Sequence, residues 1–235
     1  MKQLNLLFSL YSLTAFIIII ERLSPTTKIL LPPDNFIRLH EINQTVIFLS
    51  ISVTISFFIL KSVTNNFQTL MDKGSTLLLA IFILGAYLFG AGEGWHEVAS
   101  FTLNQYCNLN NITGILCKGL FINDFYAGNI IFFIGGLLMN ISLMIFARKK
   151  PSELFSNKDI SILLINSIVY AFTWMAYAAF DKVLIGLLFS AILMTISIGF
   201  LIPVRTKLRE YPYILYSAIA YSLATIVSII IRFLV

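Results

Sequence analysis

Charged residues are scarce in this chain of 235 residues. Asp, Glu, Lys and Arg together make up only 11% of it, whereas soluble globular proteins carry about 25%. Hydrophobic residues contribute 58%, and the mean hydropathy is +0.90. This composition excludes a soluble globular fold and predicts an integral membrane protein built from transmembrane helices.

Basic clusters with interleaved aromatic residues are also missing, although the net charge is +5. Binding to nucleic acid is therefore not expected. The lysines and arginines stand instead in short segments between apolar runs, where such residues orient a protein in its membrane. The partners that this pattern predicts are membrane lipids.

Long apolar runs are abundant. A helix needs about 20 apolar residues to cross a bilayer, and seven such runs fit into the chain. We expect a single domain over residues 1–235, an all-α bundle of seven transmembrane helices. The first run resembles a signal-peptide core, but no small-x-small cleavage site precedes Glu21, so we expect it to be retained. The predicted spans are residues 4–20, 39–60, 76–100, 127–147, 160–180, 183–202 and 213–233.

The uneven distribution of charge between the connecting segments predicts an orientation. Ten of the 16 Lys and Arg residues lie on the side of the N-terminus, and seven of the 11 Asp and Glu residues lie on the other side. Since basic loops stay in the cytoplasm, we expect a cytoplasmic N-terminus and a C-terminus outside.

Cysteine is rare, with only Cys107 and Cys117 in the chain. Their spacing is not the CxxC of redox and zinc sites. Both lie in the segment 102–124, which we expect to be the longest outer loop, where disulfides persist. A Cys107–Cys117 disulfide is therefore predicted, with two unpaired thiols as the alternative.

Two further absences exclude known seven-span classes. Residues 213–235 contain no lysine, which a retinal protein needs in its last span for the Schiff base. No histidine follows His96, whereas ceramidase-like and progestin-receptor-like membrane hydrolases keep a histidine pair near the last span.

One polar stretch ends the third apolar run, Ala91-Gly92-Glu93-Gly94-Trp95-His96-Glu97. On a helix Glu93, His96 and Glu97 share one face, whereas Trp95 does not. The glycines of this run, at positions 85, 90, 92 and 94, would let a neighbouring helix approach closely,. Ionisable residues at the edge of a bilayer are costly to place, so the stretch predicts a functional site.

His40 lies at the start of the second run, about as far from the end of that run as His96 lies from the start of the third. The two histidines are therefore expected at the same depth in the membrane. The short connection between the second and third runs makes the two helices antiparallel neighbours, so we expect the two histidines to meet. Asp124 enters at the same level before the fourth run. Other residues expected in this pocket are Glu41, Asn129, Tyr177 and Asp181.

Imidazole and carboxylate ligands together suit zinc or iron. The predicted metal ligands are His40, His96 and Glu93, and the predicted catalytic groups are Glu93, Glu97 and Asp124. A metal-dependent enzyme, such as a hydrolase that acts on a lipid or amphipathic substrate, is the favoured function. The orientation places this pocket on the periplasmic, extracellular or lumenal side.

Three alternatives remain open for the same residues. They could form only an interfacial polar network. They could line the acidic outer vestibule of a small transporter or channel, or the two histidines could ligate haem in an electron carrier. The carboxylates gather at one face, and paired breaks in mid-span helices are not evident, which favours the enzyme over the transporter.

Overall fold

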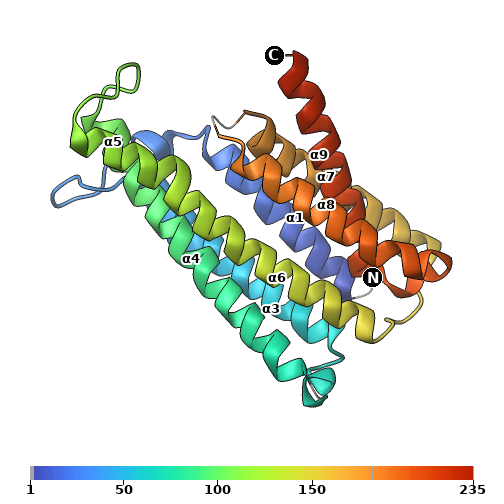
Figure 1. Cartoon of the computed structure of the whole chain (residues 1–235). Helices are drawn as coiled ribbons and strands as arrows, with labels where there is room; N and C mark the ends of the chain where they lie inside the picture. The colour runs from blue at the N-terminus through green and yellow to red at the C-terminus, as the bar shows by residue number, and fades with distance from the viewer. Residues whose placement is uncertain (1–2, 73, 181–182, 235) are drawn as a thin grey trace.

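The computed structural model describes residues 3–72, 74–180 and 183–234, and their regular structure is helical. Seven helical segments within these ranges are long and apolar enough to cross a membrane, as predicted. Figure 1 shows them running side by side in one bundle. The seven are Gln3–Glu21, Leu39–Val63, Ser75–Tyr106, Ile115–Lys149, Asn157–Phe180, Ile185–Glu210 and Pro212–Leu234.

Two of these segments contain a stretch of π-helix. The π-helix η2 (Asn43–Phe48) joins α2 to α3, and η4 (Asn123–Gly128) joins α5 to α6. Short 3₁₀ segments are η1 (Pro25–Lys28), η3 (Gln68–Met71) and η5 (Ile202–Glu210). The α-helices are α1 (Gln3–Glu21), α2 (Leu39–Ile42), α3 (Leu49–Val63), α4 (Ser75–Tyr106), α5 (Ile115–Ile122), α6 (Asn129–Lys149), α7 (Asn157–Phe180), α8 (Ile185–Leu201) and α9 (Pro212–Leu234).

The segment 102–124, expected as a loop, is largely helical. Helix α4 continues to Tyr106, and the apolar residues Ile115–Ile122 form α5. The chain breaks only between them, where Gly114 has a φ of +80° that favours glycine,. The predicted disulfide between Cys107 and Cys117 is present and closes this short turn.

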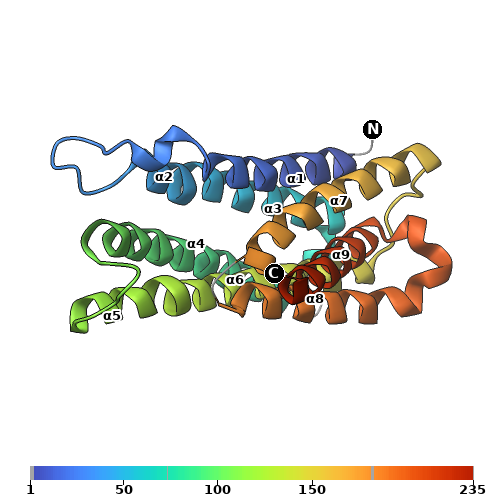
Figure 2. The same cartoon turned by 90° about the horizontal axis from the view of Figure 1, so that it is seen from above.

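The helices pack in groups that Figure 2 shows from above. Helix α1 lies over α3 on one side, and α4 lies along α6 on the other. Helix α9 packs against α7 and α8. Polar contacts tie α1 to its neighbours, since Asn5 donates to Asp159 of α7 at 3.1 Å and Ser12 bonds the hydroxyl of Tyr216 in α9 at 2.9 Å.

Glycines bring the backbones of α4 and α6 together. A Cβ atom at Gly92 would lie 2.1 Å from the backbone nitrogen of Phe132, and one at Gly135 would lie 2.2 Å from that of Phe89. Gly85 and Gly128 are also crowded, with backbone atoms 2.9 and 2.7 Å from the position of a Cβ. By contrast, the expected contribution of Gly90 and Gly94 is wrong, since a Cβ at Gly94 would meet nothing within 4 Å and one at Gly90 only a leucine methyl.

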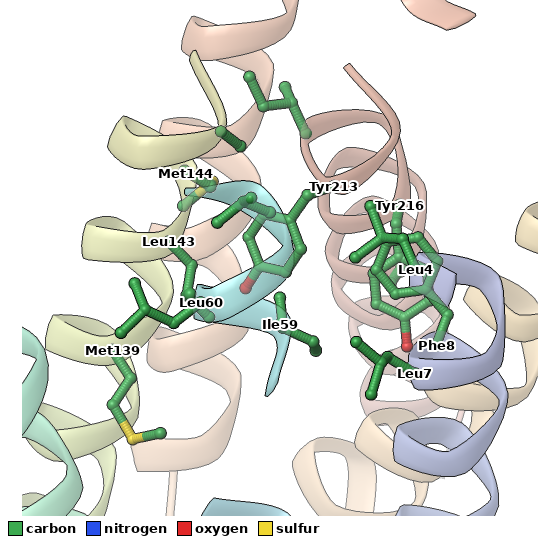
Figure 3. Close-up of a cluster of buried hydrophobic side chains, with 14 of the residues drawn as sticks. Leu4, Leu7, Phe8, Ile59, Leu60, Met139, Leu143, Met144, Tyr213 and Tyr216 are labelled. Atoms are coloured by element: carbon green, nitrogen blue, oxygen red, sulfur yellow. The ribbon is translucent and has the colours of Figure 1, made fainter. Parts of the chain in front are cut away.

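Apolar packing fills the half of the bundle that contains the N-terminus. Figure 3 shows part of this cluster, and the labelled side chains come from α1, α3, α6 and α9. Phe8 stacks on Tyr216 with ring centroids 4.4 Å apart. The labelled members are Leu4, Leu7, Phe8, Ile59, Leu60, Met139, Leu143, Met144, Tyr213 and Tyr216.

Candidate functional site

Within the described ranges, five buried ionisable residues gather at the opposite end of the bundle, whereas Asp159 is buried at the N-terminal end. Glu21 ends α1, His40 and Glu41 lie in α2, Glu97 lies in α4, and Asp124 lies in η4. Glu97 follows the start of α4 by a helical rise of about 33 Å, close to the thickness of the hydrocarbon core, which is about 30 Å. The site therefore lies at the level of one membrane surface.

The two π-helices adjoin the site, as such turns often do. Segment η2 begins directly after α2 and carries Asn43 and Gln44 toward Glu21. Segment η4 contains Asp124 and places it against His96 of α4. A π-turn contains one residue more than an α-helical turn. Each π-helix therefore rotates the side chains of the helix before it relative to those of the helix after it.

His40 is held by Glu21. Its Nδ1 lies 2.6 Å from Glu21 Oε2, and the side chains of Gln44 and Asn43 donate to the same carboxylate at 2.7 and 3.1 Å, as does the Thr26 hydroxyl. Glu21 is 7% exposed and His40 is 8% exposed. A carboxylate that accepts the Nδ1 proton fixes the ring and leaves Nε2 as a ligand atom, as at many metal sites.

Glu41 is fully buried and paired with Arg38. The backbone N–H of Arg38 donates to Glu41 Oε2 at 2.9 Å, and the guanidinium Nε donates to Oε1 at 2.8 Å, with a second contact from Nη2. The backbone contact caps the first turn of α2. The guanidinium also lies 5.3 Å from the ring centre of Phe101, which connects this pair to α4.

Glu97 has a different environment. Its side chain is almost completely buried, yet within the described residues its carboxylate accepts no hydrogen bond. It faces His40 Nε2, 3.7 Å from its Oε2. This distance is too long for a hydrogen bond, and two lone pairs face each other when Nδ1 carries the ring proton. A cation between the two atoms would remove that repulsion.

His40, Glu41 and Glu97 form the group that could hold such a cation. One ligand atom from each lies within 4.8 Å of the others, and all three residues are buried. Three carboxylates surround the imidazole here, those of Glu21, Glu41 and Glu97. Arg38 pairs directly with Glu41, and the positive charges of Arg22 and His96 act on Glu97 without a direct ion-pair contact to it. A divalent cation would balance the remaining negative charge, so the donor set fits a metal such as zinc or iron.

His96 belongs to a second network. Its Nδ1 lies 3.0 Å from the backbone oxygen of Asp124, a hydrogen bond, and 2.8 Å from Asp124 Oδ1, an ion-pair contact. Asn129 donates to the backbone oxygen of Asp124 at 2.8 Å, and the hydroxyl of Tyr177 donates to Asn129 Oδ1 at 2.6 Å. In the described part of the chain, His96 Nε2 has no hydrogen-bond acceptor. Asp124 thus orients the imidazole, as a carboxylate orients the general base of many enzymes.

A partly enclosed cavity of about 120 Å³ lies beside both networks. Glu93, Gln44 and Arg22 line it near the site, and the Arg22 guanidinium lies 5.4 Å from the ring centre of Tyr177, another wall residue. Toward the middle of the bundle the wall is mostly apolar and aromatic. These residues include Ile18, Leu49, Phe89, Phe132, Trp174 and Phe189.

The predicted ligands are thus divided between three places. His40 is in the three-residue group, His96 pairs with Asp124, and Glu93 lies in the cavity wall. The predicted catalytic residue Glu97 lies in the three-residue group instead. Among the expected pocket residues, Glu41 joins that group, while Asp181 lies outside the described residues.

Two residues that organise the site were not predicted from the sequence. Glu21 ends the first apolar run, as Glu93 and Glu97 end the third, and this shared position was the signal available for it. Arg38 precedes Glu41 by three residues, a spacing that indicates a pair on one helical turn. No protein-family model matches the chain, and no curated protein or solved structure is significantly similar to it.

Proposed function

We propose that this protein is a metal-dependent membrane enzyme that acts on a lipid or amphipathic substrate. The observation that carries the proposal is the carboxylate of Glu97, which is 2% exposed and lies opposite His40 Nε2 without a hydrogen-bond donor among the described residues. A buried carboxylate that accepts no hydrogen bond is costly. A bound divalent cation gives this carboxylate its counter-charge.

Three protein ligands would hold the metal, namely His40 through Nε2 and the carboxylates of Glu41 and Glu97. Such a set leaves a coordination position for water or substrate. A zinc or iron ion there supplies a Lewis acid and lowers the pKa of a bound water. Glu21 orients His40 from the other side of the ring.

The remaining residues of the site bind the substrate or transfer protons during its hydrolysis. Glu93 lies one helical turn before Glu97 and lines the cavity, so its carboxylate accepts the proton of the attacking water in hydrolysis of an ester or amide,. The His96–Asp124 pair returns a proton to the leaving group. The apolar cavity wall takes the chain of the substrate. The excess of basic loops on the N-terminal side favours an outward-facing site.

Metal analysis of the detergent-purified protein tests the proposal. We expect a stoichiometric transition metal in the wild type and its loss in His40→Ala and Glu97→Gln, because each change removes a ligand. His96→Ala is expected to keep the metal, since its imidazole pairs with Asp124. Glu210→Gln, at the other end of the bundle, is the matched control for Glu97→Gln.

Unfolding midpoints of the four variants show whether a loss of metal reflects a loss of fold. A wild type without metal, or a Glu97→Gln variant that keeps a full complement, would overturn the metal site. Loss of the metal in His96→Ala as well as in His40→Ala would instead favour the ligand set expected from the sequence, which contains both histidines. An absorption spectrum of the same sample tests the haem alternative, which requires a Soret band.

A transporter is the second candidate, and one observation favours it. The cavity wall includes Asn140 of α6, so the cavity reaches well into the bundle from the level of Glu93. A solute path needs such polar groups within the membrane. Uptake of a substrate by proteoliposomes, without chemical change to it, would distinguish this function from the enzyme.

A further inference from the structure

Asn140 marks the deep end of the cavity. Gly92 packs against Gly128 and Phe132, so the neighbouring Glu93 lies level with the start of α6. Asn140 lies 12 residues after Gly128 and eight residues after Phe132, which is a helical rise of about 12 to 18 Å. The cavity therefore extends from the membrane surface to the middle of the bilayer.

The amide of Asn140 is incompletely satisfied. Its Oδ1 accepts from the hydroxyls of Tyr213 and Tyr221 at 3.0 and 3.2 Å, and its Nδ2 donates to the backbone oxygen of Gly136 at 2.8 Å. The second Nδ2 hydrogen has no acceptor among the described residues. The side chain is only 8% exposed and lines the cavity. An unmet donor in an apolar interior is unfavourable, so an acceptor within the cavity would satisfy it.

Other polar side chains accompany Asn140 at this depth. The Tyr170 hydroxyl lies 3.5 Å from that of Tyr221, and the rings of Tyr170 and Tyr11 stack with centroids 5.2 Å apart. Tyr11, Tyr170 and Ser56 all line the cavity. The wall is thus polar at the membrane surface, apolar along its middle and polar again at its end.

We infer that the cavity binds a single-chain amphiphile that carries a hydroxyl or carbonyl oxygen about 15 Å from its headgroup. The oxygen accepts from Asn140, the chain lies between the aromatic rings, and the headgroup lies beside Arg22 and Glu93. The inference specifies the substrate of the proposed enzyme, and only the chemical conversion of that substrate rests on the proposed function.

Binding of dodecanoic acid and 12-hydroxydodecanoic acid to the metal-chelated protein tests this inference. Trp174 lines the cavity, whereas Trp95 is half-exposed, so a Trp95→Phe background leaves Trp174 as the reporter whose fluorescence a ligand changes. We expect the hydroxy acid to bind about five- to tenfold more tightly, as one added hydrogen bond to a buried donor predicts. Equal affinities of the two acids would overturn the inference, and this comparison needs no change at Asn140.

Two sets of variants then locate the binding. Ala15→Phe fills the cavity and is expected to abolish binding of both acids, whereas Ala80→Phe on the exposed face of α4 is expected to leave binding unchanged. Asn140→Leu is expected to remove only the preference for the hydroxy acid. Unchanged binding in Ala15→Phe contradicts the inference. These binding measurements use metal-free protein. Failure of the binding prediction therefore does not affect the metal analysis of Glu97→Gln, and failure of the metal site does not affect the binding of the two acids.

Discussion

Gly92→Ala is expected to lower the unfolding midpoint of the detergent-purified protein by about 6 to 12 °C, which corresponds to about 3 kcal/mol. The alanine Cβ would lie 2.1 Å from the backbone nitrogen and 2.6 Å from the Cα of Phe132. Backbone atoms of a helix cannot rotate away as a side chain can, so α4 and α6 must separate. The change would also move Gly128, and with it the segment that holds Asp124 against His96.

Gly94→Ala is the matched control for this change. It lies two residues further along the same helix, and a Cβ there meets nothing within 4 Å. Since alanine is a better helix former than glycine, the midpoint should stay the same or rise slightly. Equal effects at the two positions would mean that close packing of α4 on α6 does not stabilise the protein.

In the metal-free protein, Arg38→Met is expected to destabilise the fold by about 3 to 5 kcal/mol, the cost of leaving the buried Glu41 carboxylate without its ion-pair partner,. Glu41 is fully buried, and the Arg38 guanidinium donates to its Oε1 through Nε at 2.8 Å and through Nη2. Methionine keeps the apolar contact with Phe101 while it removes the charge,. Denaturant or thermal unfolding of the purified protein measures the loss.

The double variant Arg38→Met/Glu41→Gln separates charge from packing. Because no unpaired charge remains in it, its stability should recover by at least half of the loss. Arg209→Met, at an exposed arginine that bonds Asn157, is the control and should change stability by less than about 1 kcal/mol,. A double variant as unstable as Arg38→Met would show that the guanidinium acts through packing alone.

The site combines two networks of similar construction. Each histidine is held at Nδ1 by an acidic residue of another segment, His40 by the Glu21 carboxylate and His96 by the backbone oxygen of Asp124 together with an ion-pair contact to its Oδ1. The Nε2 atom of each histidine is therefore left for another interaction. The surroundings differ, because His40 Nε2 faces Glu97 and lies near Glu41, whereas His96 Nε2 has no acceptor among the described residues. The first arrangement suits a metal ligand and the second a proton carrier.

The location of the site could be predicted because it depends on position along the chain. Glu93, His96 and Glu97 end one apolar run, and His40 and Glu41 begin another. The lengths of those runs place such residues at one membrane surface, whatever the arrangement of the helices. The partners of each residue could not be predicted in this way. His40 was expected to meet His96, and its Nδ1 is instead occupied by Glu21, which comes from α1.

The sequence by itself determined the class of protein, the seven spans and the end of the bundle that carries the site, and it predicted the disulfide that the structure contains. These properties follow from hydropathy, run length and spacing, which are local along the chain. The tertiary structure decided the rest. Contact between α4 and α6 at Gly92 and Gly135 fixes their register, and the π-turns set which faces meet. For that reason only the fold reveals the group of His40, Glu41 and Glu97 and the cavity that ends at Asn140.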